Sequence, residues 1–222
     1  MISRRAILGG VSSAVFAAAA APAFGLEMCP FAGMPAGSCS ALIDPQRFQA
    51  QNTFDEQEES QWCWAASISM VCRFHGFHLS QKSIVTRIYK GSVNMSGDDR
   101  LLTEALNSNW EDDDGRRLRI SADVFSPMLR QGNIDNRRVV DDLKNDRPLI
   151  VGSRAHTTVL ARVDYFPQPN GQPRIGRVHV VDPFPKAAPP PWYARFLEAD
   201  EMVPVLNGGS LRYLASIRVT PN

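Results

Sequence analysis

The chain has 222 residues, of which 44% are hydrophobic and 21% are charged, and its formal net charge is +1. This is the composition of an ordinary globular protein with enough chain for one good core. Because no field of one sign stands out, the composition gives no support for nucleic-acid binding. The mixed run EDDDGRR at residues 111–117 is best explained as a solvated loop.

The first 23 residues have the features of an export signal. Arg4 and Arg5 precede an Ala/Gly/Ser-rich stretch that ends in Ala21-Pro22-Ala23, a small-x-small cleavage pattern. The sequence SRRAIL resembles the twin-arginine export signal. A membrane anchor is the alternative, but the apolar run is short of large side chains and ends at a proline. We therefore expect a periplasmic or secreted protein, exported in the folded state, with no stable membrane insertion after signal cleavage.

Residues 24–53 are predicted to form an irregular N-terminal arm on the surface. Of the four cysteines, Cys29 and Cys39 lie in this Pro/Gly-rich segment, and Cys63 and Cys72 follow it. Export permits disulfides, and although four cysteines allow three pairings, we expect a Cys29–Cys39 bridge that leaves the other two free. Metal binding is less favoured because there is no C-x-x-C pair and no nearby histidine. We expect no metal and no cofactor.

Three helices are predicted in the first half of the chain. The segment 63–74 contains no Pro or Gly and has apolar residues at helical spacing, and Gly76 follows it as a C-cap candidate. Ser80 is a predicted N-cap for a helix over 81–90, which Gly91 would end. A third helix is predicted over 98–109.

The second half of the chain has the pattern of an antiparallel sheet. The strands are expected at 117–125, 148–153, 156–166, 173–183 and 211–219. Short helices are expected at 136–146 and 191–199. Since helices precede strands, we predict an α+β fold with a helical half packed on an antiparallel β-sheet half.

Cys63 is the candidate nucleophile. A free thiol is mostly protonated at neutral pH, but a helix N-terminus and a neighbouring imidazolium lower its pKa. Cys63 begins the first predicted helix, whereas Cys72 lies on the apolar stripe in its middle and is predicted to be a core residue. The amide of Gln57, in the preceding polar loop, and the Cys63 backbone N–H are candidate donors to a developing oxyanion.

His156 is the preferred base among the four histidines. His75 and His78 follow the same helix, and His75 is about 18 Å along its axis from Cys63. His156 opens a predicted strand, where a side chain reaches the edge of a cleft, whereas His179 lies within a strand and is expected to be packed or on the surface.

Asp182 is the preferred partner for His156, as an acceptor for the ring nitrogen Nδ1. Asp182 ends the strand that follows the His156 strand along the chain. In an antiparallel pair the start of one strand lies opposite the end of the next, so the two residues are expected side by side. Asp164, at the turn end of this hairpin, is a poorer partner.

The order Gln57, Cys63-Trp64-Ala65, His156 and Asp182 resembles the papain-like cysteine peptidases. The segments QWCWAAS, RPLIVGSRAHTTVL and GRVHVVDPFP are similar to a compact bacterial branch. That branch includes a secreted effector protease of plant pathogens and the peptidase domains of bacteriocin exporters. The resemblance covers about residues 54–185.

The resemblance implies a papain-like fold with the active-site cleft between its halves. It also implies that Cys63 is the nucleophile, His156 the base, Asp182 the residue that orients the base, and Gln57 part of the oxyanion hole. Three features depart from papain. An aspartate replaces the asparagine of papain, EESQW replaces the glycine-rich segment before the cysteine, and we expect no long inhibitory propeptide.

We therefore predict a thiol hydrolase that cleaves peptide bonds through a Cys–His–Asp triad and an acyl-enzyme intermediate. Its expected partner is a peptide or protein substrate, with cell-wall peptides as one candidate. An acyltransferase, a cell-wall peptide amidase with the same triad, and a non-catalytic binding protein on this scaffold are the alternatives. The predicted domains are a signal peptide (1–23), the arm (24–53) and a peptidase domain (54–222).

Overall fold

A computed structural model describes residues 25–29, 36–184 and 194–222. Within these residues nine strands form one antiparallel sheet in the order β1-β2-β6-β5-β9-β4-β3, with β7 beside β6 and β8 beside β7. The strands are β1 (Leu26–Met28), β2 (Cys39–Leu42), β3 (Asn109–Glu111), β4 (Arg117–Phe125), β5 (Leu149–Ser153), β6 (His156–Phe166), β7 (Arg174–Val181), β8 (Ala194–Phe196) and β9 (Leu211–Pro221).

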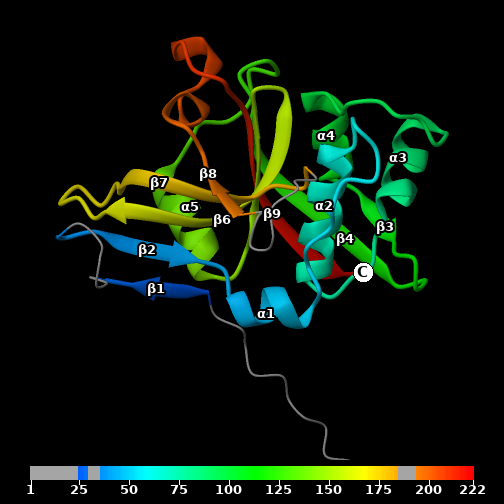
Figure 1. The fold of residues 1–222 in the computed structure, drawn as a ribbon, viewed down its shortest axis with the longest axis horizontal. Coiled ribbons are helices and arrows are strands. Elements are labelled where there is room, and N and C mark those ends of the chain that lie inside the picture. The colour runs from blue at the N-terminus through cyan, green and yellow to red at the C-terminus, as the bar shows by residue number, and fades with distance from the viewer. Residues whose placement is uncertain (1–24, 30–35, 185–193) are drawn as a thin grey trace, which may run out of the picture.

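Helices α2, α3 and α4 gather on one side of the molecule, and strands β1, β2, β6 and β7 lie on the other (Figure 1). The helices are α1 (Pro45–Ala50), α2 (Cys63–Phe74), α3 (Gln81–Tyr89), α4 (Asp99–Ala105) and α5 (Asn136–Lys144), with 3₁₀ turns at η1 (Ala199–Met202) and η2 (Val205–Asn207). The predicted α+β class, with a helical and a sheet half, is therefore confirmed.

Helix α2 is the central element of the core. All of its residues except Arg73 are buried, so its buried surface is wider than the apolar stripe that the sequence predicted. Ile68 and Met70 are fully buried in one cluster with Ile120 and Ile150, which come from strands β4 and β5. The helix is thus fixed against the sheet, and its first residue has a defined position.

The N-terminal arm is a correction to the sequence analysis. Within residues 25–29 and 36–53, β1 pairs with β2 and β2 pairs with β6, so this segment extends the sheet and is not irregular. Cys39, Ala41 and Ile43 are buried in the core. The strands are too short to show a pattern in the sequence, and their pairing with β6 stabilises them. The predicted Cys29–Cys39 disulfide is present, and Cys63 and Cys72 are free.

Two other elements differ from the prediction. The helix expected at 191–199 is wrong, because Ala194–Phe196 forms β8 on the edge of β7; residues 191–193 lie outside the described part. The helix expected at 98–109 ends at Ala105, because residues 109–111 pair with β4 as β3. In both places tertiary strand pairing decides the local structure.

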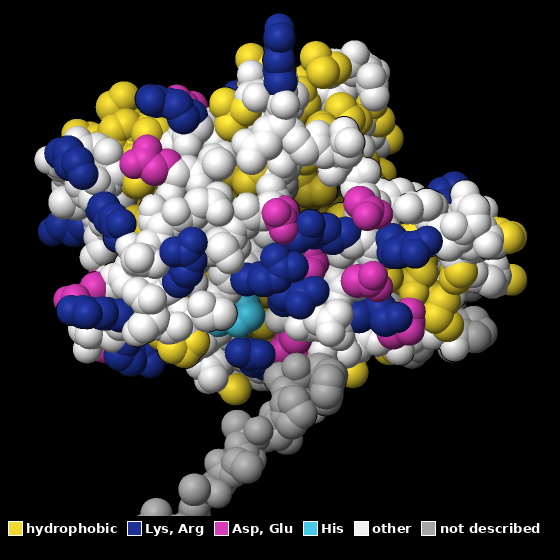
Figure 2. Space-filling view, turned by 180° about the vertical axis from the view of Figure 1, so that it is seen from behind, with side chains coloured by type: hydrophobic (Ala, Val, Ile, Leu, Met, Phe, Trp, Pro, Cys, Tyr) yellow, Lys and Arg dark blue, Asp and Glu magenta, His cyan; other side chains and the backbone are white. Residues whose placement is uncertain are grey.

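The predicted signal peptide, residues 1–23, lies outside the described residues. None of the helices in the described part of the chain is long and apolar enough to cross a membrane. The same residues contain no group of three or more His, Cys, Asp or Glu side chains that could hold a metal ion. On the face seen in Figure 2, basic side chains lie among acidic ones.

Candidate active site

Cys63 is the first residue of α2, as the sequence predicted. The indoles on either side of it hold one loop: Trp62 Nε1 donates to the Val93 carbonyl at 2.9 Å, and Trp64 Nε1 donates to the Met95 carbonyl at 3.2 Å. The start of α2 is therefore attached to the segment that borders the site. At a helix start the backbone N–H groups have no intrahelical partner, which favours a thiolate there.

Cys72, one of the two free thiols, is a core residue. It is fully buried, and burial together with the charge of Asp112 raises the pKa of its thiol to about 12. Cys72 is therefore inert at neutral pH, which agrees with the packing role predicted for it.

His156 follows a tight turn that sets its position. β5 and β6 are joined by two residues, Arg154 (φ 45°) and Ala155 (φ 59°), both in the left-handed region that primed hairpin turns require. Ser153 is the strand partner of His156 across this turn. Two L-residues with positive φ are costly, so packing around the turn must hold it in place.

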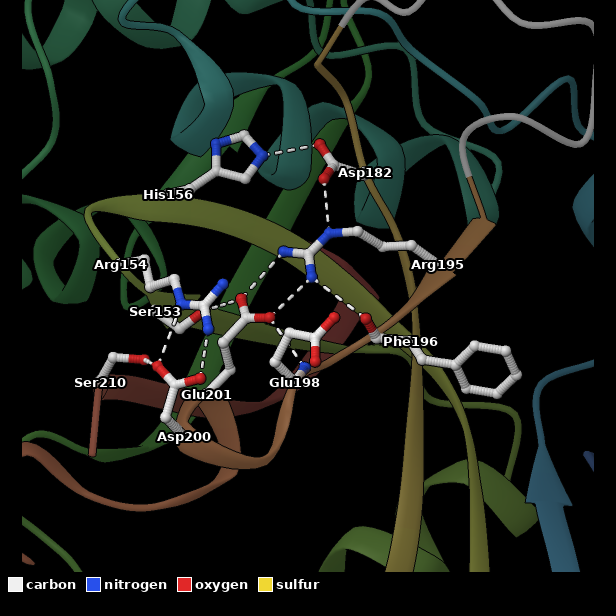
Figure 3. A network of polar contacts seen from close by, with 10 residues as sticks. All are labelled: Ser153, Arg154, His156, Asp182, Arg195, Phe196, Glu198, Asp200, Glu201 and Ser210. Atoms are coloured by element: carbon white, nitrogen blue, oxygen red, sulfur yellow. Dashed lines mark hydrogen bonds and ion pairs between the residues drawn. The ribbon is translucent and has the colours of Figure 1, made fainter. Parts of the chain in front are cut away.

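The structure brings His156 and Asp182 together, since the end of β7 lies beside the start of β6. The imidazole Nε2 is 2.6 Å from Asp182 Oδ1 (Figure 3). The prediction that Nδ1 faces the carboxylate was therefore wrong, because Nε2 faces it. Nδ1 is the ring nitrogen that is left to face the Cys63 thiol. The Phe184 ring meets the imidazole edge-on, with ring centroids 6.2 Å apart. Asp182 Oδ1 also accepts from the Phe184 N–H at 2.9 Å.

The thiol of Cys63 and the imidazole of His156 shift each other's pKa. Burial acts to raise the pKa of Cys63, but His156 and, to a smaller extent, Thr157 act in the opposite direction, and the net result is a lowered pKa. Burial acts to lower the pKa of His156, but Asp182 and Cys63 raise it to about 9. Both changes favour a thiolate beside an imidazolium at neutral pH.

Thr157 is a further contact of Cys63 that the sequence analysis missed. It lines the same pocket as Cys63, and its backbone and side-chain hydrogen-bonding groups help to lower the pKa of the thiol. The residue is buried on β6, directly after His156. Strict alternation along a strand would place its side chain on the opposite face from His156, so the sequence pattern contained no signal for this contact.

Gln57 is buried near the other three residues, but its amide is engaged elsewhere. Its backbone N–H donates to the Pro183 carbonyl at 2.9 Å, which ties the loop before α2 to the residue after Asp182. Its side-chain Nε2 donates to the carbonyls of Glu59 (3.0 Å) and Ser60 (3.2 Å). Its Oε1 is buried and has no hydrogen-bond partner among the described residues. The structure thus shows no free Gln57 N–H for an oxyanion, and that role stays a prediction.

A pocket of about 140 Å³ opens beside Cys63. The residues around it that matter here are Cys63, Trp64, Gly97, His156, Thr157 and Tyr213. A Cβ atom on Gly97 would lie 2.8 Å from the Trp64 ring, so only glycine lets this loop pack against the indole. The pocket is a candidate place for a substrate side chain next to the thiol.

The other three histidines lie away from Cys63. His75 is half-buried, and desolvation together with the charges of Arg47 and Arg147 lowers its pKa to about 4. His78 is exposed, and its Nδ1 is 3.3 Å from Asp114. His179 Nε2 is 3.1 Å from Asp164 Oδ2, and its ring lies against Phe196. The position of His179 agrees with the packed or surface role predicted for it.

A helix that begins with a cysteine, packed on an antiparallel sheet that carries a histidine, is the arrangement of a papain-like cysteine peptidase. Residues 44–188 match the model of the family described as papain-like cysteine protease AvrRpt2. The match spans more than half of the 222 residues, so the chain belongs to this family. The protein is therefore a cysteine peptidase that acts on peptide or protein substrates, and the predicted fold family is confirmed.

Two solved structures are also similar to this chain. One is the peptidase domain of Streptococcus ComA, described as a bi-functional ABC transporter involved in a quorum-sensing pathway; identity is 16%, the TM-score is 0.41, and 76% of this chain and 97% of that chain are covered. The other is UfSP from C. elegans, with 12% identity, a TM-score of 0.44, and coverage of 89% of this chain and 38% of that chain. No curated protein sequence matches the chain.

Proposed function

We propose that this cysteine peptidase cleaves peptide bonds with Cys63 as nucleophile, His156 as base and Asp182 as the residue that orients the base. The observation that carries the proposal is the position of His156 between two partners: its Nε2 is 2.6 Å from Asp182, and it lines one pocket with Cys63, where each residue shifts the pKa of the other. This leaves a thiolate at the start of a helix, next to a cation that can supply a proton.

The reaction then has two steps. The thiolate attacks the substrate carbonyl, and the His156 imidazolium gives its proton to the leaving amine, which leaves an acyl-enzyme on Cys63. Neutral His156 next removes a proton from water, which attacks the thioester and releases the acid and the thiolate. The backbone N–H of Cys63 is free of an intrahelical partner and serves as one oxyanion donor.

The experiment is peptide hydrolysis by the mature protein and by Cys63→Ala and His156→Ala. We expect both variants to lose turnover, and His179→Ala to keep it as a control histidine that is also paired with an aspartate. Iodoacetamide should alkylate Cys63 and spare Cys72. A Cys63→Ala variant with native turnover would refute the proposal.

Gln57 is proposed as the second oxyanion donor, which requires its amide to leave the carbonyls of Glu59 and Ser60 when substrate binds. Gln57→Ala should then lower kcat by about 100-fold, the usual effect of removing one such donor. Gln57→Glu keeps the size of the side chain and serves as the matched variant. A native kcat in both would remove Gln57 from the mechanism.

We also propose that the protein works outside the cytoplasm, on the basis of the twin-arginine pattern at Arg4 and Arg5. Replacing both by lysine should retain the protein in the cytoplasmic fraction, as shown by fractionation and immunoblotting. Cell-wall peptides are a reasonable first substrate in that location. Release of peptides from purified peptidoglycan, compared with digestion of an unfolded protein, tests that choice.

A further inference from the structure

An ion pair of half-buried Arg195 and buried Glu201 lies on the side of Asp182 that faces away from His156 (Figure 3). Arg195 comes from β8, the strand that the sequence predicted as a helix. Its Nε donates to Asp182 Oδ2 at 2.8 Å. Its two terminal nitrogens donate to Glu201 at 2.9 and 3.0 Å. One guanidinium therefore joins the two carboxylates in a fixed geometry.

Glu201 holds both sides of the His156–Asp182 contact. Ser153, the strand partner of His156, donates its hydroxyl to Glu201 Oε1 at 2.7 Å. Glu201 also positions Asp182 indirectly, because Arg195 donates to both carboxylates. The Glu198 N–H also donates to Glu201 Oε2 at 2.9 Å, and the side chain of Glu201 is only 2% exposed.

Asp182 needs such a partner because its own side chain is only 5% exposed. A desolvated carboxylate 2.6 Å from an imidazole tends to take the proton of the imidazolium, which would leave two neutral groups. A charged donor on Oδ2 keeps Asp182 ionised and fixes the orientation of Oδ1, the oxygen that faces His156. Glu201 in turn balances the partly buried charge of Arg195.

We propose that Arg195 and Glu201 form a positioning pair that holds Asp182 ionised and aimed at His156. This inference rests on the proposed function, since it assumes that His156 and Asp182 act together. Neither residue touches Cys63 in the described contacts, so their effect on the reaction passes through Asp182 and Ser153. The pair should affect kcat rather than substrate binding.

The experiment compares the double variant Arg195→Gln/Glu201→Gln with the native protein. Removing both charges avoids a single unpaired buried charge. We expect kcat to fall by about 10- to 100-fold, the range set by one hydrogen bond to a charged group, with KM within about twofold. The alkylation rate of Cys63 by iodoacetamide at neutral pH should fall in parallel.

A matched control is Arg147→Gln/Asp142→Asn. This pair has the same buried character, with Arg147 29% and Asp142 1% exposed, and Arg147 Nε donates to Asp142 at 2.8 Å. Within the described residues, neither Arg147 nor Asp142 forms a hydrogen bond or ion pair with Asp182. The control should lose comparable stability, measured as Tm, but keep kcat. Equal loss of kcat in both double variants would overturn the positioning role.

Arg195→Lys keeps the positive charge and remains usable if the double variant fails to fold. Lysine offers a point charge without the fork that joins both carboxylates, so kcat should lie at least about threefold below native but above the double variant. A native kcat in Arg195→Lys, or in the folded double variant, would overturn the proposal. If Cys63→Ala keeps turnover, the proposed function itself has failed, which is a separate result.

Discussion

Replacing Asp182 with asparagine should uncouple His156 from its charge partner without changing the size of the side chain. Asp182 accepts three hydrogen bonds: Oδ1 from His156 and from the Phe184 N–H, and Oδ2 from Arg195. An asparagine offers only one oxygen. The guanidinium and the Phe184 N–H can only donate, but the hydrogen bond from the charged guanidinium is the stronger, so we expect the oxygen to face Arg195 and the amide N–H₂ to face His156.

That orientation changes the tautomer of His156. An N–H₂ donor against Nε2 requires a lone pair there, which places the ring proton on Nδ1, the nitrogen left for the thiol. A protonated, neutral Nδ1 cannot accept the proton of Cys63. The wrong tautomer is also the cause of lost activity when the aspartate of a Ser–His–Asp triad becomes asparagine.

The magnitude follows from the pKa of His156. The difference between its ordinary value of 6.5 and about 9 corresponds to about 3.4 kcal/mol. Cys63 contributes to this difference as well as Asp182, so the figure is an upper limit for the substitution. If the pKa returns to about 6.5, only about a tenth of His156 is protonated at pH 7.5, and thiolate formation falls at least about tenfold.

The assay is the pH dependence of Cys63 alkylation by iodoacetamide, followed by intact mass, together with kcat/KM. The basic limb of the native kcat/KM profile should lie near 9, where His156 loses its proton, and should move down in Asp182→Asn. Asp164→Asn, which affects the other histidine–aspartate contact at His179, is the matched control. A basic limb and a kcat/KM in Asp182→Asn equal to those of the native protein would refute this account.

The pH dependence of stability should also reveal the coupling between His156 and Asp182. Because folding raises the pKa of His156, the charged contact stabilises the native protein below about pH 6.5, and this contribution is lost as the pH rises through about 9. The difference in the free energy of unfolding between native and Asp182→Asn, measured with urea, should therefore be larger at pH 6 than at pH 10. A difference that is constant with pH would contradict the coupling.

Three further predictions concern single features of the structure. Ala155→Gly should raise the free energy of unfolding by about 1 kcal/mol in urea titrations, because Ala155 has a φ of 59°; a destabilised variant would contradict this. Gly97→Ala should raise KM, because the new Cβ would meet the Trp64 ring at 2.8 Å; native kinetics would show that the loop can adjust. Replacing Cys29 and Cys39 with serine should lower stability by about 2–3 kcal/mol, seen as a lower Tm that no longer responds to dithiothreitol.

The fold could be predicted where a pattern extends over a whole element. The bounds of α2 and β4 agree with the predicted segments, because each has a long run with a single periodicity and clear breakers around it. The prediction failed at β2 and β8, which have four and three residues. Strands that short carry no readable alternation, and only the neighbouring strand decides that they form.

The residues of the candidate site also divide into those that the sequence could predict and those that it could not. Cys63, His156 and Asp182 could be proposed because each marks the end of an element, and ends of antiparallel elements meet in a predictable way. Thr157, Arg195 and Glu201 could not be proposed. The strand pattern placed no function on Thr157. Arg195 comes from the segment that was predicted as a helix and forms β8, and Glu201 lies in η1, where the sequence analysis placed no functional residue.

The sequence alone determined the helix start at Cys63, the hairpin that pairs His156 with Asp182, and the likeness to the papain-like peptidases, since these depend on local periodicity and chain order. Tertiary structure decided which imidazole nitrogen faces Asp182, where the Gln57 amide donates, and which charges surround the carboxylate. Those features depend on contacts between β6, β7, β8 and η1. Local sequence does not encode the distances between such elements, because packing sets them.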